Sequence, residues 1–77
     1  MNAERRKKIN KIISDLEDLC IELDDIREEE QDAFDMRPES FQDTEAAQNS
    51  REAIDQMAEA LTCIESAIEE LDVIFEQ

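Results

Sequence analysis

The side chains that could do chemistry in this 77-residue chain are almost all carboxylates. The sequence contains 23 Asp and Glu residues and two cysteines, but no histidine and no glycine. Without histidine a general base would have to be a carboxylate, and a carboxylate serves as a base near neutral pH only where its environment perturbs it. The cysteines and the few Ser and Thr residues have no evident base or glycine-built oxyanion site near them. The composition therefore predicts that the protein is not an enzyme.

Metal and cofactor sites are not expected either. Di-iron helical bundles bind metal through Glu-x-x-His pairs, and a calcium loop needs a glycine at a fixed turn position. The two cysteines, Cys20 and Cys63, form no C-x-x-C pair. We expect them to be small packing residues in a reducing cytoplasm, with an intersubunit disulfide or a redox switch as alternatives. The basic start leads into an amphipathic segment and no 18-residue apolar run follows, which predicts a cytoplasmic protein that does not bind membranes.

Acidic residues dominate the chain after its first eleven positions. Residues 12–77 carry 22 acidic side chains and three basic ones, so their net charge is −19. Six carboxylates alternate at spacings of three and four and should form one continuous row along a helix; we call them the acidic ridge: Asp15, Asp18, Glu22, Asp25, Glu29 and Asp32. Spread over the roughly 50 Å length of the expected helix pair, the net charge amounts to one per about 2.6 Å, against one per about 1.7 Å in duplex DNA. The acidic surface therefore suggests DNA mimicry, and the alternative is a solubilising surface.

Two segments carry the hydrophobic seven-residue repeat that is typical of packed helices. With Ile9 assigned to heptad position a, positions a and d of the first segment hold Ile9, Ile12, Leu16, Leu19, Leu23, Ile26, Glu30 and Ala33. Position e adds Ile13, Cys20 and Phe34, so the apolar face is wider than a two-stranded coiled coil needs. In the second segment the a and d positions hold Ile54, Met57, Leu61, Ile64, Ile68, Leu71 and Phe75, with Ala53, Ala60, Ala67 and Ile74 at position g.

These repeats predict an all-α fold in which one domain, residues 1–77, forms a long antiparallel helical hairpin. Pro38 should end the first helix, because it lacks an N–H group and disfavours a helical conformation at Arg37. We expect helices over about residues 3–36 and 44–75 and a turn over 37–43, with Asp43 or Thr44 as the cap of the second helix. Two helices leave part of the apolar faces uncovered, so we also predict a homodimer that forms a four-helix bundle. The self-association residues are expected to be Ile54, Met57, Leu61, Ile64, Ile68 and Leu71.

The antiparallel arrangement also brings two unfavourable charge clusters together. Five basic residues crowd the start of the first helix and four acidic ones the end of the second, in each case at the end where the helix dipole disfavours them. Folding back should let the two clusters offset one another. The alternative is that the basic cluster contacts a nucleic acid or a membrane, although we expect no direct nucleic-acid binding.

The turn has more large side chains than a simple connection requires. Phe34, Met36 and Phe41 place three apolar groups around one proline. They could plug the open end of the helix pair, or they could form a partner-binding tip in which Phe34, Met36, Arg37 and Phe41 participate, with Arg37 and Glu39 as its polar rim.

The sequence of the turn also follows a recognisable pattern. It matches the pattern E-E-x-x-x-F/Y-D-x-x-P-E-S-[LF]-Q through Glu29, Glu30, Phe34, Asp35, Pro38, Glu39, Ser40, Phe41 and Gln42. In this turn and in most of its helical sequence, the chain resembles small acidic helical proteins of phages and mobile elements. The resemblance implies a phage or prophage setting, where small acidic proteins often inhibit the DNA-handling machinery of the host.

Two functional hypotheses follow from the sequence. The first is an acidic inhibitor or DNA mimic that occupies the basic groove of a nucleic-acid-binding host protein. The second is a helical assembly or adaptor module whose heptads pair with a second copy or with another coiled coil. Groove mimicry should weaken steeply with salt, whereas heptad pairing should not.

Overall fold

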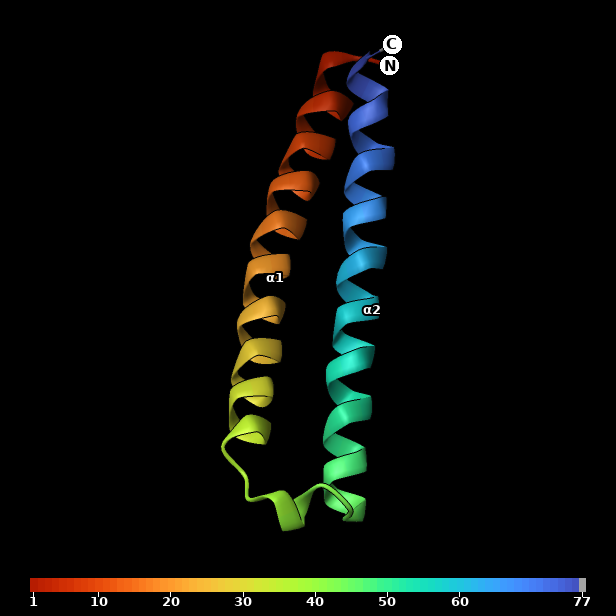
Figure 1. Cartoon of the computed structure of the whole chain (residues 1–77). Coiled ribbons are helices and arrows are strands. Elements are labelled where there is room, and N and C mark those ends of the chain that lie inside the picture. Colours follow the sequence, from red (N-terminus) through yellow and green to blue (C-terminus); the bar gives the residue numbers. More distant parts are fainter. Residues whose placement is uncertain (77) are drawn as a thin grey trace.

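The computed structural model describes residues 1–76 as a helical hairpin. Helix α1 spans Ala3–Asp35 and helix α2 spans Glu45–Val73, with short 3₁₀ helices η1 at Glu39–Phe41 and η2 at Ile74–Glu76. The two long helices lie side by side and antiparallel, so that the N and C termini meet at one end and the turn forms the other (Figure 1). The predicted all-α hairpin is therefore confirmed.

Both long helices begin at side-chain caps. The Asn2 side chain accepts a hydrogen bond from the Arg5 N–H at 2.9 Å, and the Thr44 hydroxyl accepts one from the Ala47 N–H at 3.1 Å. The Thr44 hydroxyl also donates to the Phe41 carbonyl at 2.6 Å, which links the cap of α2 to the end of η1. Of the two cap candidates in the sequence, Thr44 is thus the one that the structure uses.

Pro38 determines where α1 ends. Met36 and Arg37 still donate backbone hydrogen bonds to carbonyls of the last turn, at 3.1 and 3.2 Å. Pro38 has no N–H and adopts an extended backbone conformation, with φ −66° and ψ 158°, so the helix cannot continue. The chain then turns through η1 and enters α2.

The stripe of α2 faces α1 as the sequence predicts. Its a and d positions are all buried or half-buried, while the alanines at position g are exposed. Ile54 and Leu61 are the most buried members of the stripe, at 8 and 9% exposure. Positions a and d of the second segment therefore form one side of the contact between the helices.

The a/d stripe of α1, unlike that of α2, does not face the other helix in the way that the sequence predicts. Its a positions do, together with the e positions Ile13, Cys20, Arg27 and Phe34, but the d positions Ile12, Leu19 and Ile26 remain half-exposed or more. Position e supplies Ile13, Cys20 and Phe34 as contact residues, so rotation of α1 toward this position keeps apolar side chains against α2. The rotation brings Ile13 into the core at 6% exposure and leaves the carboxylates of position g on the outside.

The resulting core is thin. Among the described residues, only Ile13, Ala47, Ile54 and Leu61 are buried. The molecule measures 59 × 15 × 15 Å, and its radius of gyration of 17.6 Å exceeds the value of about 11.5 Å for a compact chain of this length. A core of this size provides only about 3–5 kcal/mol of stability. The hairpin is thus mostly surface, and its function must be sought there.

Candidate partner-binding surfaces

The acidic ridge lies on the outside of α1. All six of its carboxylates are exposed. They occupy heptad positions g and c, whereas positions a and e of the same helix face α2. Because α1 is an uninterrupted helix from Ala3 to Asp35, the six side chains follow one another along a single side of the rod. The structure therefore brings the predicted ridge residues together.

Little positive charge compensates the ridge. Lys11 Nζ lies 2.8 Å from the Asp15 carboxylate, with both side chains more than half exposed. The hydrogen bond to Asp15 and the charge of its carboxylate raise the pKa of Lys11. Within residues 1–76, no other ridge carboxylate has a Lys or Arg nitrogen within 4.0 Å. Five adjacent negative charges therefore remain available to a partner.

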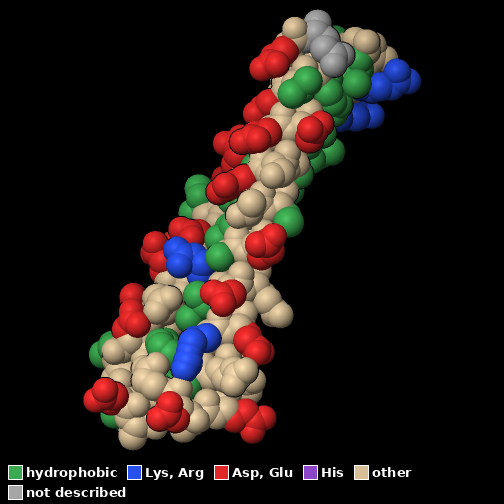
Figure 2. All heavy atoms as spheres, turned by 45° about the vertical axis from the view of Figure 1, so that its right-hand side comes forward, with side chains coloured by type: hydrophobic (Ala, Val, Ile, Leu, Met, Phe, Trp, Pro, Cys, Tyr) green, Lys and Arg blue, Asp and Glu red, His purple; other side chains and the backbone are tan. Residues whose placement is uncertain are grey.

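Carboxylates also cover the outer side of α2. The outward-facing members Glu45, Glu52, Asp55, Glu59 and Glu69 are all exposed. Figure 2 shows acidic side chains along both helices of the visible face, with basic side chains grouped at the end that holds the termini and at isolated positions farther down. The negative field thus extends over the length of the molecule, and the ridge is its most regular part.

The basic start of α1 and the acidic end of α2 lie at the same end of the hairpin (Figure 1). Among residues 1–76, however, no ion pair joins the two clusters. The contact there is between Arg6, whose guanidinium lies 5.8 Å from the ring centre of Phe75, and that ring. Arg5, Lys7 and Lys8 are exposed, so this end presents free positive charge to solvent.

The turn holds two of its predicted residues together and leaves two at the surface. The rings of Phe34 and Phe41 meet edge to face, with their centres 5.9 Å apart. Met36 is 86% exposed, and Arg37 lies over Phe41 with its guanidinium 4.9 Å from the ring centre. The two phenylalanines therefore pack as a plug, while Met36 and Arg37 form the exposed tip.

Arg51 is a structural residue of the turn that the sequence reasoning did not single out. Its guanidinium lies 5.3 Å from the ring centre of Phe34, and both of its terminal nitrogens donate hydrogen bonds to the Gln42 carbonyl. It thereby connects α2 to both sides of the turn. The signal was present in the sequence, because Arg51 is the only basic residue of the second helix.

The residues predicted to mediate self-association lie in the contact between α1 and α2 of the same chain. Ile54 and Leu61 are buried there, and Met57, Ile64, Ile68 and Leu71 are half-buried. A polar pair interrupts this apolar contact, where the Ser50 hydroxyl donates to the Glu30 carboxylate at 2.6 Å. Among the described residues, the exposed large apolar side chains at heptad positions a and d are instead those of position d in α1.

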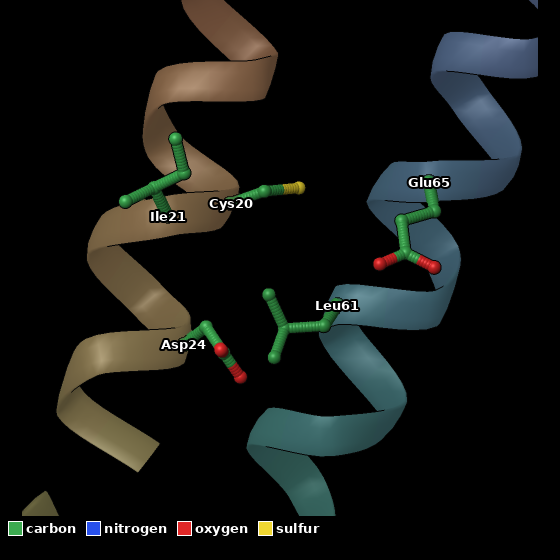
Figure 3. Close-up of a pocket in the computed structure, with 5 residues that line it drawn as sticks. All are labelled: Cys20, Ile21, Asp24, Leu61 and Glu65. Carbon is green, nitrogen blue, oxygen red and sulfur yellow. The ribbon is translucent and has the colours of Figure 1, made fainter. Parts of the chain in front are cut away.

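A shallow hollow opens between the helices near their middle. Cys20 of α1 and Leu61 of α2 point toward one another across it, Asp24 and Glu65 border it, and Ile21 lies on the outer side of α1 (Figure 3). A second hollow nearer the turn is lined by Gln31, Phe34, Arg51, Ile54 and Asp55. Asp24 is already paired with Arg27, at 2.9 Å. Neither hollow is lined by a histidine or lysine that could activate the Cys20 thiol.

Metal-binding and membrane-spanning features are absent from the described part of the chain. Residues 1–76 contain no group of three or more potential ligands placed to hold a metal ion. Over the same residues, neither helix combines the length and the apolar character needed to cross a membrane. Comparison of the chain with protein-family models, with curated proteins and with solved structures gave no match.

Proposed function

We propose that this protein is a non-enzymatic interaction protein whose acidic ridge binds the basic groove of a nucleic-acid-binding protein. In this proposal it acts in the cytoplasm as an inhibitor that competes with DNA. The resemblance of its turn to small acidic phage proteins supports a phage or mobile-element origin, with a host protein as the partner.

The observation that carries the proposal is the set of five ridge carboxylates that are exposed and have no basic neighbour within the described residues. Ordinary exposed helices gain stability from pairs of opposite charge three or four residues apart. The ridge forgoes such pairs beyond Lys11–Asp15 and holds like charges at these spacings. A surface that only kept the protein soluble would gain from mixed signs, whereas a binding surface for a basic groove would not.

The shape of the molecule supports the same partner. The hairpin is an elongated rod, 59 Å long and 15 Å across. Its charges lie along the rod axis, as phosphates do along a duplex. Complementary fields of this kind accelerate association and make it sensitive to salt.

A second candidate function is helical assembly, with the hairpin pairing into a dimeric four-helix bundle. The observation that favours it is the exposure of Ile12, Leu19 and Ile26, at 50, 52 and 53%. Three large apolar side chains at one heptad position are a feature of a helix that has a further neighbour. The two functions are compatible, because the ridge residues at position c point away from both apolar sides of α1.

The test of the ridge is capture from a host-cell lysate by two matched variants. The first neutralises Asp18, Glu22, Asp25 and Glu29 to Asn or Gln, and the second neutralises Glu45, Glu52, Asp55 and Glu59 on α2. Each variant removes four charges, so overall charge is controlled. We expect the wild type and the α2 variant to capture a basic protein at about 50 mM salt and to release it at about 500 mM, and the ridge variant to lose most of that capture.

Helicity must be measured in the same samples by circular dichroism. The ridge variant should remain helical or become more so, because repulsion between like charges three and four residues apart is relieved. Equal capture by the ridge variant and the wild type would refute the mimic and leave the turn tip or the apolar side of α1 as the binding surface.

A further inference from the structure

The half-exposed apolar residues at position d of α1 share one side of the hairpin with the alanines at position g of α2. The two hollows place Asp24 and Gln31 of α1 on the same side as Glu65 and Arg51 of α2. Heptad position d of α1 and position g of α2 must therefore lie together on the opposite side. We call this surface the apolar flank; it consists of Ile12, Leu19, Ile26, Ala53, Ala60 and Ala67.

The register of the hairpin aligns the two halves of this flank. The Glu30–Ser50 hydrogen bond joins residues whose numbers sum to 80. In an antiparallel pair the same sum, within about one residue, applies along the whole contact. Leu19 thus lies level with Ala60, and Ile12 and Ile26 lie level with Ala67 and Ala53. The flank is a row of large residues beside a row of small ones.

The amount of exposed surface indicates how large an interface the chain can supply. The hairpin exposes 5941 Å², whereas a compact monomer of 9.0 kDa is expected to expose about 4,900 Å². The excess is about 1,000 Å². A stable protein–protein interface buries about 800 Å² on each partner. The excess is of the same order as the area that each partner buries in a stable dimer.

The charges at the two ends of the rod differ and can select an orientation. At the terminal end, residues 1–11 hold five basic residues and one acidic residue, which face four acidic residues in 69–76. At the turn end, residues 28–45 hold eight acidic residues and one basic residue. Two rods that overlap turn on turn would bring two strongly negative ends together. Two rods that run in opposite directions place each negative end beside the free basic residues of the other.

We infer that the apolar flank packs against the same flank of a second copy, with the two hairpins antiparallel. This inference rests on the proposed self-association and names its surface and direction. Leu19 is the central residue of α1, which spans Ala3–Asp35, so a two-fold axis at Leu19 overlaps the rods completely. Each Ile12 then lies opposite the second copy's Ile26, and α1 packs on α1.

This arrangement also pairs charges beside the flank. Lys8, Asp15, Glu22 and Glu29 occupy position g, which borders position d on the outside. With the axis at Leu19, Lys8 of each copy lies near Glu29 of the other, and Asp15 of each copy lies near Glu22 of the other. The attractive pairs therefore lie farther from the axis and offset the repulsive pairs nearer to it. Positions a and d of α1 are then both covered, one by α2 of the same chain and the other by the second copy. The heptad stripe of the first helix is thus used on both of its sides.

The first experiment measures the mass in solution by sedimentation equilibrium over a range from about 1 to 100 μM. The wild type should be a dimer of the 9.0 kDa chain. Leu19→Asp should raise the dissociation constant on the order of 100-fold or more, because it buries two unpaired charges at the axis. Ile21→Asp is the matched control: Ile21 is 64% exposed but lies beside the hollow on the other side, so its variant should stay dimeric.

The second experiment uses an engineered disulfide and does not depend on a destabilised variant. In a background of Cys20→Ala and Cys63→Ser, the double variant Lys8→Cys/Glu29→Cys should oxidise to a covalent dimer. The two positions are roughly 31 Å apart along one helix, so a bond within one chain is impossible. Asn10→Cys/Gln31→Cys has the same spacing on the other side of α1 and should not cross-link.

The outcomes of these experiments test self-association, the apolar flank as its surface, and the antiparallel orientation separately. A monomeric wild type at every concentration would overturn both the proposed self-association and this inference. A dimer that Leu19→Asp weakens no more than Ile21→Asp does would leave self-association intact and overturn the apolar flank as its surface. A dimer in which the Lys8→Cys/Glu29→Cys variant fails to cross-link would overturn the antiparallel orientation.

Discussion

The two long helices carry the same kind of heptad stripe, yet they use it differently. In α2 every member of the a/d stripe is turned toward α1. In α1 the stripe is divided: the a positions contact α2, and Ile12, Leu19 and Ile26 at position d are left half-exposed. The difference lies in what borders the stripe. Position e of α1 holds Ile13, Cys20 and Phe34, whereas position e of α2 holds Arg51, Ala58, Glu65 and Asp72.

A heptad pattern thus identifies which residues are apolar but not how far a helix is rotated about its axis. The rotation depends on what the neighbouring rows would meet. The mostly polar side chains at position e of α2 favour its a/d stripe as the contact with α1. The mostly apolar side chains at position e of α1 instead join its a positions in the contact. The same rotation keeps the acidic ridge on the outside and exposes the apolar flank.

The largest expected effect is a loss of helicity, and it distinguishes the buried a/d stripe of α2 from an exposed position of α1. Leu61→Asp and Ile64→Asp should abolish helicity at 25 °C, because each places a charge in a core that contributes only about 3–5 kcal/mol. Ile21→Asp, at a position that is 64% exposed, should retain the helical signal. Circular dichroism at 222 nm measures both. A folded Leu61→Asp variant would contradict the assignment of the α2 stripe to the core.

A smaller effect is expected at the turn, where Arg51 contacts Phe34 and the Gln42 carbonyl. Arg51→Ala should cost about 1–2 kcal/mol, from the lost cation–π contact and hydrogen bonds. For a domain of this size, this corresponds to a decrease of about 4–16 °C in Tm. Arg37→Ala removes a comparable contact with Phe41 but no hydrogen bond, and it should lower the Tm less. Equal decreases in Tm for the two variants would show that the hydrogen bonds of Arg51 do not stabilise the turn.

The smallest effect contrasts the caps of the two helices. Thr44→Ala should cost about 1 kcal/mol, because it removes the bond from the Ala47 N–H and the bond to the Phe41 carbonyl. Asn2→Ala removes a single bond to the Arg5 N–H at an exposed terminus, where helix ends fray readily, and should cost a few tenths of a kcal/mol. Thermal unfolding resolves the two. A larger loss for Asn2→Ala would contradict this order.

The sequence was sufficient to predict the hairpin and the exposure of the ridge residues. Pro38, the two apolar repeats and the cap candidates are local signals, and local rules interpret them correctly. The rotation of α1 could not be derived in this way, because positions d and e of α1 are both mostly apolar and the choice between them depends on packing against α2. Arg51 was missed for a related reason, since its partners Phe34 and Gln42 become neighbours only when the turn closes.

The most direct test of the central claim is competition between this protein and duplex DNA for the basic protein recovered by capture. A fluorescent duplex bound to that protein would be titrated with the wild type and with the ridge variant that carries four neutralised carboxylates. We expect the wild type to release the duplex, and the ridge variant to need at least about tenfold more protein because its summed field is reduced. Binding of the wild type without release of the duplex, or equal release by both proteins, would contradict the proposed mimicry.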